Sequence, residues 1–204
     1  MNLTVIPLTG EKKDGKFCFF EELKKILQCN KFTIKNGDVL VISSKFISNS
    51  QGRILEINNS KVCNKAKEIA KKFNSNEKFM EIVFRESDNI LGGVAGFVMS
   101  TTNGILAPNA GIDKSNSKGT KIILYPNEPY NFAEELKRKI FLELNLHVGI
   151  IIVDSRLMPA RIGTTGVAIA CAGIEPTKDL RGEKDLDGNP LKVTFQATAD
   201  NLAS

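Results

Sequence analysis

Hydrophobic and polar positions along the chain follow two different periods. In four segments apolar residues recur every three or four positions, which is the spacing of one buried helix face. Short apolar runs between turn residues instead predict strands. The expected helices are 20–29, 60–73, 77–86 and 131–145, and the expected strands are 3–6, 39–42, 96–101, 104–107, 121–124 and 147–153.

Two further segments complete this prediction. A strand of small residues follows Gly166, and a strand near Phe195 leads into the start of a helix. Strands that alternate with helices, several of them apolar throughout, favour an α+β (mixed α/β) protein with a mixed sheet and flanking helices. The Rossmann class is disfavoured because no G-x-G-x-x-G follows a strand, and the chain has neither a Walker A sequence nor a repeat.

Composition fits an ordinary globular protein. Of 204 residues, 42% are hydrophobic and 25% are charged, which excludes disorder as the overall state. Apolar runs fall far short of the ~20 residues that span a bilayer, so no membrane partner is expected. Four cysteines occur without a C-x-x-C pair, and the first residues lack the pattern of a signal peptide. We therefore expect a cytoplasmic protein.

A net charge of +5 raises the question of a nucleic-acid partner. Many of the lysines belong to the predicted helix 60–73, and no aromatic side chains alternate with them as a stacking surface requires. The charge therefore favours a small polyanionic substrate, or an ordinary solvated surface, over nucleic acid. These lysines are Lys61, Lys65, Lys67, Lys71 and Lys72.

The densest candidate chemistry lies between Gly149 and Thr194. The strand 147–153 is expected to stop at Asp154-Ser155, and an oxygen pair at a strand end suits a hard cation or a phosphate-bearing ligand. Two cations, Arg156 and Arg161, follow, and then a turn is expected over residues 163–166. A charged segment, 179–185, comes after the small-residue strand.

Three other places carry candidate site residues. The apolar strand 39–42 is expected to be covered on both faces, and Ser43-Ser44-Lys45 is expected to form a loop after it. Hydroxyls and an ammonium there can bind phosphate, although such a trio is more often a cap beside a surface lysine. Gly111 allows a bend or a close ligand before Asp113. The turn after Pro7 can present main-chain N–H groups, or it is a plain surface loop. His147, the only histidine, lacks the partners that zinc or nucleophilic catalysis needs.

Three ordered blocks of sequence resemble the coenzyme F420-0:L-glutamate ligase family. The first runs from Gly37 through Arg53 and the second is N-A-G-I-D-K-S-N, residues 109–116. The third combines D-S-x-x-x-P-x-R, G-V-A-I-x-x-A-G and D-L-R-G-x-x-D-L-x-G-x-P-L-x-V-T. Together the blocks span nearly the whole chain in order.

The resemblance implies a function and a fold. Members of this family add γ-linked L-glutamate to a deazaflavin coenzyme precursor, activating a carboxylate with GTP as an acyl phosphate. Mg²⁺ or Mn²⁺ is implied as the metal, with K⁺ as a further candidate ion. The implied architecture is an unusual α+β fold in an intertwined homodimer.

The same resemblance assigns roles to residues of this chain. It implies that Asp113, Asp154 and Ser155 hold the divalent metal, which makes Asp154 a catalytic candidate. Arg156 and Arg161 are further catalytic candidates because a cation near Asp154 can stabilise developing negative charge. Carboxylates with water and phosphate are ligands that Mg²⁺ and Mn²⁺ prefer. The nucleotide-binding residues implied are Gly10, Glu11, Lys12, Ser44, Lys45, Asn49 and Asn116.

The chain also departs from the family pattern. Lys12 stands where a second proline is expected, and Asn49 and Gln51 replace a lysine and a glutamate. Leu157, Met158 and Ala160 replace glycine, arginine and tryptophan.

Beyond the position of Ser204, members of the family continue through a helix into a glycine-rich acidic segment with nucleotide contacts and a second-metal ligand. We therefore predict one ligase-like domain over 1–204 without that segment, weak as a ligase by itself or completed by a separate chain. The alternatives are a ligase-like module that binds nucleotide or metal without turnover, and a ligase for another acceptor.

Overall fold

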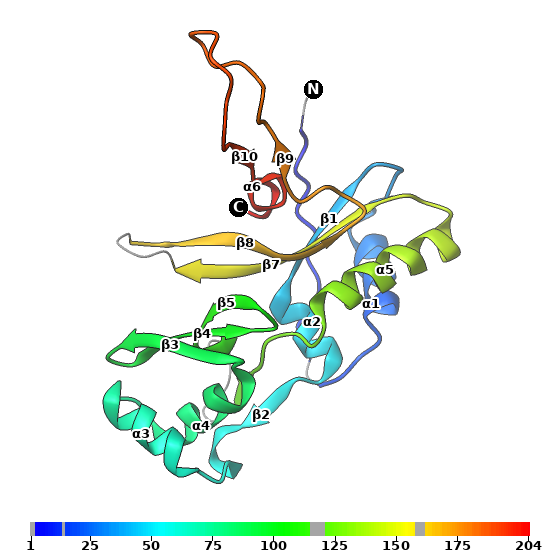
Figure 1. The fold of residues 1–204 in the computed structure, drawn as a ribbon. Helices are drawn as coiled ribbons and strands as arrows, with labels where there is room; N and C mark the ends of the chain where they lie inside the picture. The colour runs from blue at the N-terminus through cyan, green and yellow to red at the C-terminus, as the bar shows by residue number, and fades with distance from the viewer. Residues whose placement is uncertain (1–2, 14, 115–120, 158–161) are drawn as a thin grey trace. The chain divides into compact units, whose positions relative to one another are not determined.

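The computed structural model describes residues 3–13, 15–114, 121–157 and 162–204. The chain forms two compact units (Figure 1). The first unit comprises Met1–Ile34 and Ser44–Asn127, and the second comprises Lys35–Ser43 and Glu128–Ser204.

Four α-helices belong to the first unit, and apolar stripes explain the formation of three of them, α1, α3 and α4. In α4, the Asn76 side chain also accepts a 3.0 Å hydrogen bond from the Phe79 amide, a standard N-cap. The predicted helices 20–29 and 77–86 are confirmed, and the helix predicted from residue 60 begins at Asn64. The helices are α1 (Phe19–Cys29), α2 (Ser44–Gln51), α3 (Asn64–Lys72) and α4 (Glu77–Glu86), with short 3₁₀ turns η1 (Ile57–Asn59) and η2 (Asn109–Gly111).

Two antiparallel sheets complete the first unit. One pairs β2 (Ile54–Glu56) with β6 (Lys121–Ile123), and the other is the meander β3 (Asn89–Val94), β4 (Phe97–Thr102) and β5 (Ile105–Pro108). Side chains from α3, α4, β4 and β6 form one apolar core. The predicted strands 96–101 and 104–107 are confirmed, and they pair as the hairpin of β4 and β5. Strand β3 was not predicted, because its glycines indicated a break in regular structure.

A mixed three-stranded sheet organises the second unit. Its order is β1 (Val39–Ser43), β7 (Gly149–Leu157) and β8 (Thr164–Ala172), with β1 parallel and β8 antiparallel to β7. Helix α5 (Pro129–Leu144) packs against β7 and β8. Proline in its first turn and left-handed Asn145 at its end fit the usual helix boundaries. The α+β class with a mixed sheet is confirmed.

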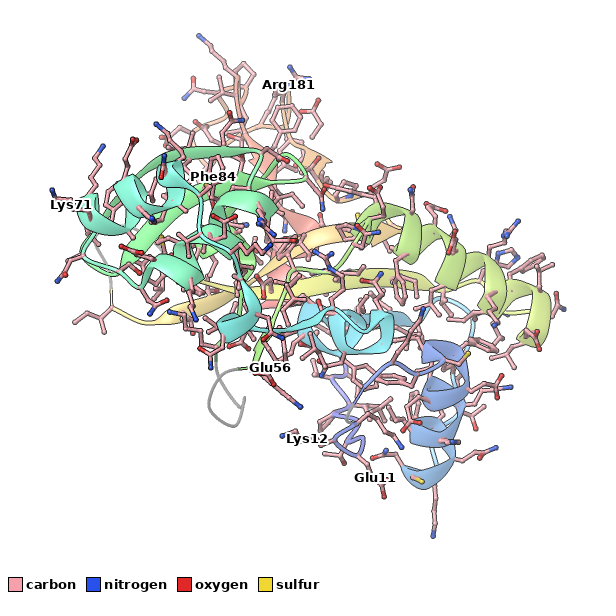
Figure 2. All side chains as sticks on the ribbon, turned by 90° about the horizontal axis from the view of Figure 1, so that it is seen from below. Glu11, Lys12, Glu56, Lys71, Phe84 and Arg181 are labelled. Atoms are coloured by element: carbon pink, nitrogen blue, oxygen red, sulfur yellow. The ribbon has the colours of Figure 1, made fainter. Side chains whose placement is uncertain are left out.

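The remaining chain of the second unit is an extended arm followed by a short helix. Strands β9 (Lys178–Asp179) and β10 (Phe195–Gln196) pair antiparallel at the base of the arm, and α6 (Thr198–Ala203) follows. Arg181, labelled in Figure 2, forms a 2.7 Å ion pair with Asp179 and holds the pKa of that carboxyl at about 2. The predicted strand near Phe195 and the start of a helix are confirmed.

Five local predictions were wrong. Residues 3–6 form no strand, and Val41, expected to be covered on both faces of its strand, is 47% exposed. Ser44-Lys45 opens a helix rather than a loop. Strand β7 does not stop at Asp154 but continues to Leu157, because β8 pairs with it residue for residue there. The expected turn over residues 163–166 is accordingly the beginning of β8 from Thr164 onward.

Candidate active site

In the first unit, Lys45 and Asp113 meet across 68 residues of sequence. The Lys45 Nζ donates to Asp113 Oδ2 at 2.5 Å, and the two side chains are 27% and 34% exposed. Lys45 is placed by the first turn of α2. Main-chain hydrogen bonds in both directions join Asp113 to Ile123, the last residue of β6. The structure therefore brings a predicted nucleotide residue and a predicted metal ligand together.

The backbone leading to Asp113 is held in an uncommon conformation. Asn109, Ala110 and Gly111 have φ values of 50°, 56° and 67°, all in the left-handed region. The Asn109 side chain accepts from the Val98 amide at 2.9 Å, and the Ala110 amide donates to the Ser100 hydroxyl at 2.9 Å. Such strain persists only where the surroundings enforce it. Strand β4 thus fixes the approach to Asp113.

Gly111 is required by a neighbouring ring. A Cβ at this position would lie 2.1 Å from Cδ2 of Tyr125, a side chain that is 2% exposed. The close approach expected at this glycine is therefore made by an aromatic side chain of the same unit.

Lys114, next in sequence to Asp113, lies over the ring of Phe79. Its Nζ is 3.3 Å from the ring centroid, a cation–π contact. Burial lowers the pKa of this lysine. Lys114 is thus a second lysine close to the Lys45–Asp113 pair, since it directly follows Asp113 in the sequence.

The segment with Gly10, Glu11 and Lys12 is anchored against α1. The Asn30 side chain, at the end of α1, donates to the Thr9 carbonyl at 2.9 Å, and Lys13 forms a 3.1 Å ion pair with Glu22. Glu11 and Lys12 themselves are exposed and point outward (Figure 2). This segment has neither helix nor strand, as a ligand-contacting loop requires.

Asn49 and Gln51, near the end of α2, occupy the positions where the family pattern has a lysine and a glutamate. Gln51 exchanges two hydrogen bonds with the main chain of Asn127, at 2.9 and 2.8 Å. Asn49 Oδ1 is buried and accepts no hydrogen bond from the residues that the structure describes. Gln51 is therefore used to fasten α2, and the Asn49 oxygen points inward.

In the second unit, Asp154, Ser155 and Arg156 lie in the half of β7 that pairs with the start of β8. Their partners are Val167, Gly166 and Thr165. Successive strand side chains point to opposite faces. Asp154 and Arg156 consequently share one face, and the Ser155 hydroxyl lies on the other. Asp154 and Arg156 are half-buried and Ser155 is exposed.

Two predicted residues, Asn116 and Arg161, lie outside the described residues. In the described ranges, no group of three or more His, Cys, Asp or Glu side chains is placed to hold a metal ion. The donors predicted for the metal, two carboxylates with a serine, are nevertheless the hard oxygen ligands that Mg²⁺ and Mn²⁺ prefer. The chemistry of these donors fits such an ion. The ion pair with Lys45 shows that the Asp113 carboxylate is accessible to a positive charge.

Sequence reasoning missed an ion pair behind this site. Arg53 pairs with Glu86 and also donates from Nε to the Tyr125 carbonyl at 3.0 Å. Arg53 is the last residue of the first block that resembles the family, so its importance could have been predicted from the sequence. Glu86 is the last residue of an amphipathic helix, and no sequence pattern distinguishes it.

No helix in the described part of the chain is both long and apolar enough to cross a membrane.

The protein is an enzyme of the ligase class with an α+β fold. Its mixed sheet, its Lys45–Asp113 pair and the strand that carries Asp154 are described above. Residues 8–204 match the model for F420-0:gamma-glutamyl ligase. The chain belongs to this family.

Curated relatives agree with the family model. A protein of Archaeoglobus fulgidus is 33% identical over all of this chain and 80% of its own length. One of Methanocaldococcus jannaschii is 36% identical over 85% of this chain and 70% of its own. One of Methanopyrus kandleri is 33% identical over 84% of this chain and 68% of its own. All three are named coenzyme F420:L-glutamate ligase.

Proposed function

We propose that this chain is a GTP-dependent and divalent-metal-dependent ligase that adds L-glutamate, in γ-linkage, to a deazaflavin F420 precursor. The observation that carries the proposal is the family match over residues 8–204, joined to the Lys45–Asp113 pair at 2.5 Å. The relatives' shared name supplies the substrates.

The reaction needs a positive environment for two anions. The γ-phosphate of GTP and the acceptor carboxylate repel each other, so cations near both lower the barrier. Lys45 provides one fixed positive charge, with Lys114 next to Asp113 on the chain. Arg156, on the face of β7 that carries Asp154, provides another. Arg161 remains a catalytic candidate because of its charge, and Asn116 remains assigned to the nucleotide by the resemblance.

Asp113 and Asp154 would hold Mg²⁺ or Mn²⁺. When bound, such an ion polarises phosphoryl oxygens and neutralises the charge that develops during transfer. Ser155 would contribute through its main-chain oxygen, because its hydroxyl lies on the face of β7 opposite to Asp154. Lys45 would then share Asp113 with the metal or move to the phosphates. K⁺ is kept as a candidate second ion.

The chemistry proceeds by two substitutions. An acceptor carboxylate oxygen attacks the γ-phosphorus of GTP, the bond to the β-phosphate oxygen breaks, and GDP and an acyl phosphate result. The amino nitrogen of L-glutamate then attacks the acyl carbon, phosphate leaves with the bonding pair, and the nitrogen loses a proton. No nucleophilic side chain of the protein is required, so the protein's task is positioning and charge stabilisation.

Two finer assignments belong to the same proposal. The four cysteines are free thiols, which fits a reducing compartment and supports a cytoplasmic enzyme. A homodimer is proposed from family resemblance. A separate chain that completes the site is the alternative for a preparation that binds GTP but does not turn over.

The test is GDP release by the purified protein supplied with GTP, Mn²⁺, L-glutamate and the deazaflavin acceptor, with mass spectrometry of the product. We expect glutamylated product that depends on all four components and is lost in Asp154→Asn. Glu68→Gln, which changes an exposed carboxylate of α3, is the control and should retain activity. Metal-dependent GTP binding without product would support the non-catalytic module, and absence of GTP binding would refute the proposal.

A further inference from the structure

The β7–β8 ladder contains a bulge immediately before Asp154. Ile152 lies opposite Ala170, whereas Val153 lies opposite Ala168, so Ile169 is an extra residue on β8. A bulge bends its strand, increases the local twist and re-aims nearby side chains. The direction of the ladder at Asp154 therefore depends on this one inserted residue.

Asp200 of α6 binds β8 at the bulge. Its Oδ1 accepts a 2.9 Å hydrogen bond from the Ala168 amide, 32 residues away in sequence. Ala168 is the first residue on the Asp154 side of the register shift. The amide of a strand residue thus donates to a side chain of another element.

Helix α6 also touches β8 two residues away. A Cβ on Gly166 would lie 1.9 Å from the Ala203 carbonyl oxygen, so the helix backbone rests directly on this glycine. Gly166 pairs with Ser155. The contacts at Ala168 and Gly166 flank Val167, which is the partner of Asp154. Figure 1 shows α6 beside the β7–β8 pair.

Without the bulge the ladder has a simple alternative register. Continuing the pairing of Ile152 with Ala170 would place Val153 opposite Ile169 and Asp154 opposite Ala168. The neighbours of Asp154 and the twist of its strand would both change. A contact that holds Ala168 in place selects the observed register over this alternative.

We propose that Asp200 is a positioning residue for Asp154, which it serves by fixing the bulge and register of β8 through the Ala168 amide. This inference rests on the proposed function in one respect, which is that Asp154 binds a metal ion. Residues that orient a metal ligand typically change metal affinity by about 10- to 100-fold when they are replaced.

Asp200→Ala, Asp200→Asn and the neighbouring control Asn201→Ala test this inference. Register is read by NMR, as the cross-strand contact of Asp154 with Val167 or with Ala168, together with hydrogen exchange of the Ala168 amide. Mn²⁺ affinity is read by calorimetry.

We expect the Asp154–Val167 contact to weaken in Asp200→Ala, with Ala168 exchange at least tenfold faster and Mn²⁺ binding about tenfold weaker. Asp200→Asn keeps an acceptor oxygen and should restore the register, and Asn201→Ala should resemble the wild type. Unchanged register and exchange in Asp200→Ala would overturn the inference, as would altered register with unchanged Mn²⁺ affinity. If the wild type bound no Mn²⁺, the proposed metal and the positioning role would both fail, while an intact register effect would leave Asp200 a structural clamp only.

Discussion

Asp113 and Asp154, the two carboxylates proposed to hold one ion, are positioned by different kinds of structure. In the first unit, Asp113 follows three left-handed residues packed on β4 and pairs with Lys45. In the second unit, Asp154 is an interior residue of β7, placed by main-chain pairing and a bulge. Side-chain packing and an ion pair define one carboxylate, and strand register defines the other. Substitutions should therefore affect the two regions in different ways.

The largest effect on stability is expected at Gly111. Gly111→Ala adds left-handed strain and a clash with Tyr125, and we expect a loss of about 2–4 kcal/mol in the free energy of unfolding. Chemical denaturation measures the loss. Gly104→Ala, with φ +71° and no neighbour within 4 Å of the added Cβ, is the matched control and should cost only the strain. Equal losses for both variants would contradict the packing described for Asp113.

Gly166→Ala probes the other region. The new methyl would meet the Ala203 carbonyl oxygen, so α6 must shift, at a cost of about 2 kcal/mol. Gly92→Ala, in a strand without a left-handed φ and with open space, should be nearly neutral. Thermal unfolding together with the Ala168 exchange rate measures both effects. A stable Gly166→Ala protein with unchanged exchange would show that α6 does not clamp β8.

A pH-dependent effect is expected in the core of the first unit. Glu81 is 2% exposed and accepts from the Cys63 amide at 2.8 Å and from Arg85 at 2.6 Å. These contacts, the Cys63 amide foremost, lower the pKa of Glu81 below its ordinary 4.5. A lowered folded pKa stabilises the fold above the unfolded pKa, and this stabilisation disappears as pH falls through the folded value.

Glu81→Gln should therefore cost about 1.5 kcal/mol at pH 7, because a hydrogen bond to a charged group is lost. The difference from wild type should shrink as the pH is lowered from 5 through the folded pKa of Glu81, which lies below 4.5. Urea titrations across this range measure it, with exposed Glu68→Gln as control. A constant difference at every pH would rule out the charge as its source.

The smallest effect is expected for the Mn²⁺ affinity of a variant at Lys45, the ion-pair partner of Asp113. Lys45→Met removes an ammonium that competes with a metal for this carboxylate, so Mn²⁺ binding without nucleotide should tighten about tenfold. GTP binding should weaken in the same variant, since a phosphate-facing charge is gone. Calorimetry with each ligand separates the two changes. Weaker Mn²⁺ binding would mean that Lys45 organises Asp113 rather than competing for it.

The sequence predicted the elements that bury a periodic apolar face. Helices α1, α4 and α5 and the hairpin of β4 and β5 agree with their hydrophobic spacing. Helix α2 was missed because its sequence is mainly polar, and its one fully buried large side chain, Ile47, does not make a stripe. The apolar run 3–6 pairs with no strand among the residues that the structure describes, so hydrophobicity alone did not make it a strand.

The site was predictable only as far as motifs reach. Motifs selected Lys45 and Asp113, but their pairing is a tertiary contact over 68 residues that no local pattern contains. The end of β7 was misplaced because Asp154-Ser155 is polar, whereas strand pairing uses main-chain groups and tolerates polar side chains. Asp200 stood outside every motif because its function depends on a bulge in a distant strand.

The most direct test of the account is the number of Mn²⁺ ions bound by wild type, Asp113→Asn, Asp154→Asn and the double variant in the presence of GTP. Equilibrium dialysis gives the stoichiometry, and calorimetry gives the affinities. If one ion is shared, either single change should weaken the same binding event, and the double variant should lose less than the product of the two single effects. If each single variant instead loses a separate ion and keeps the other at wild-type affinity, the two carboxylates hold different sites, and the shared-metal account is contradicted.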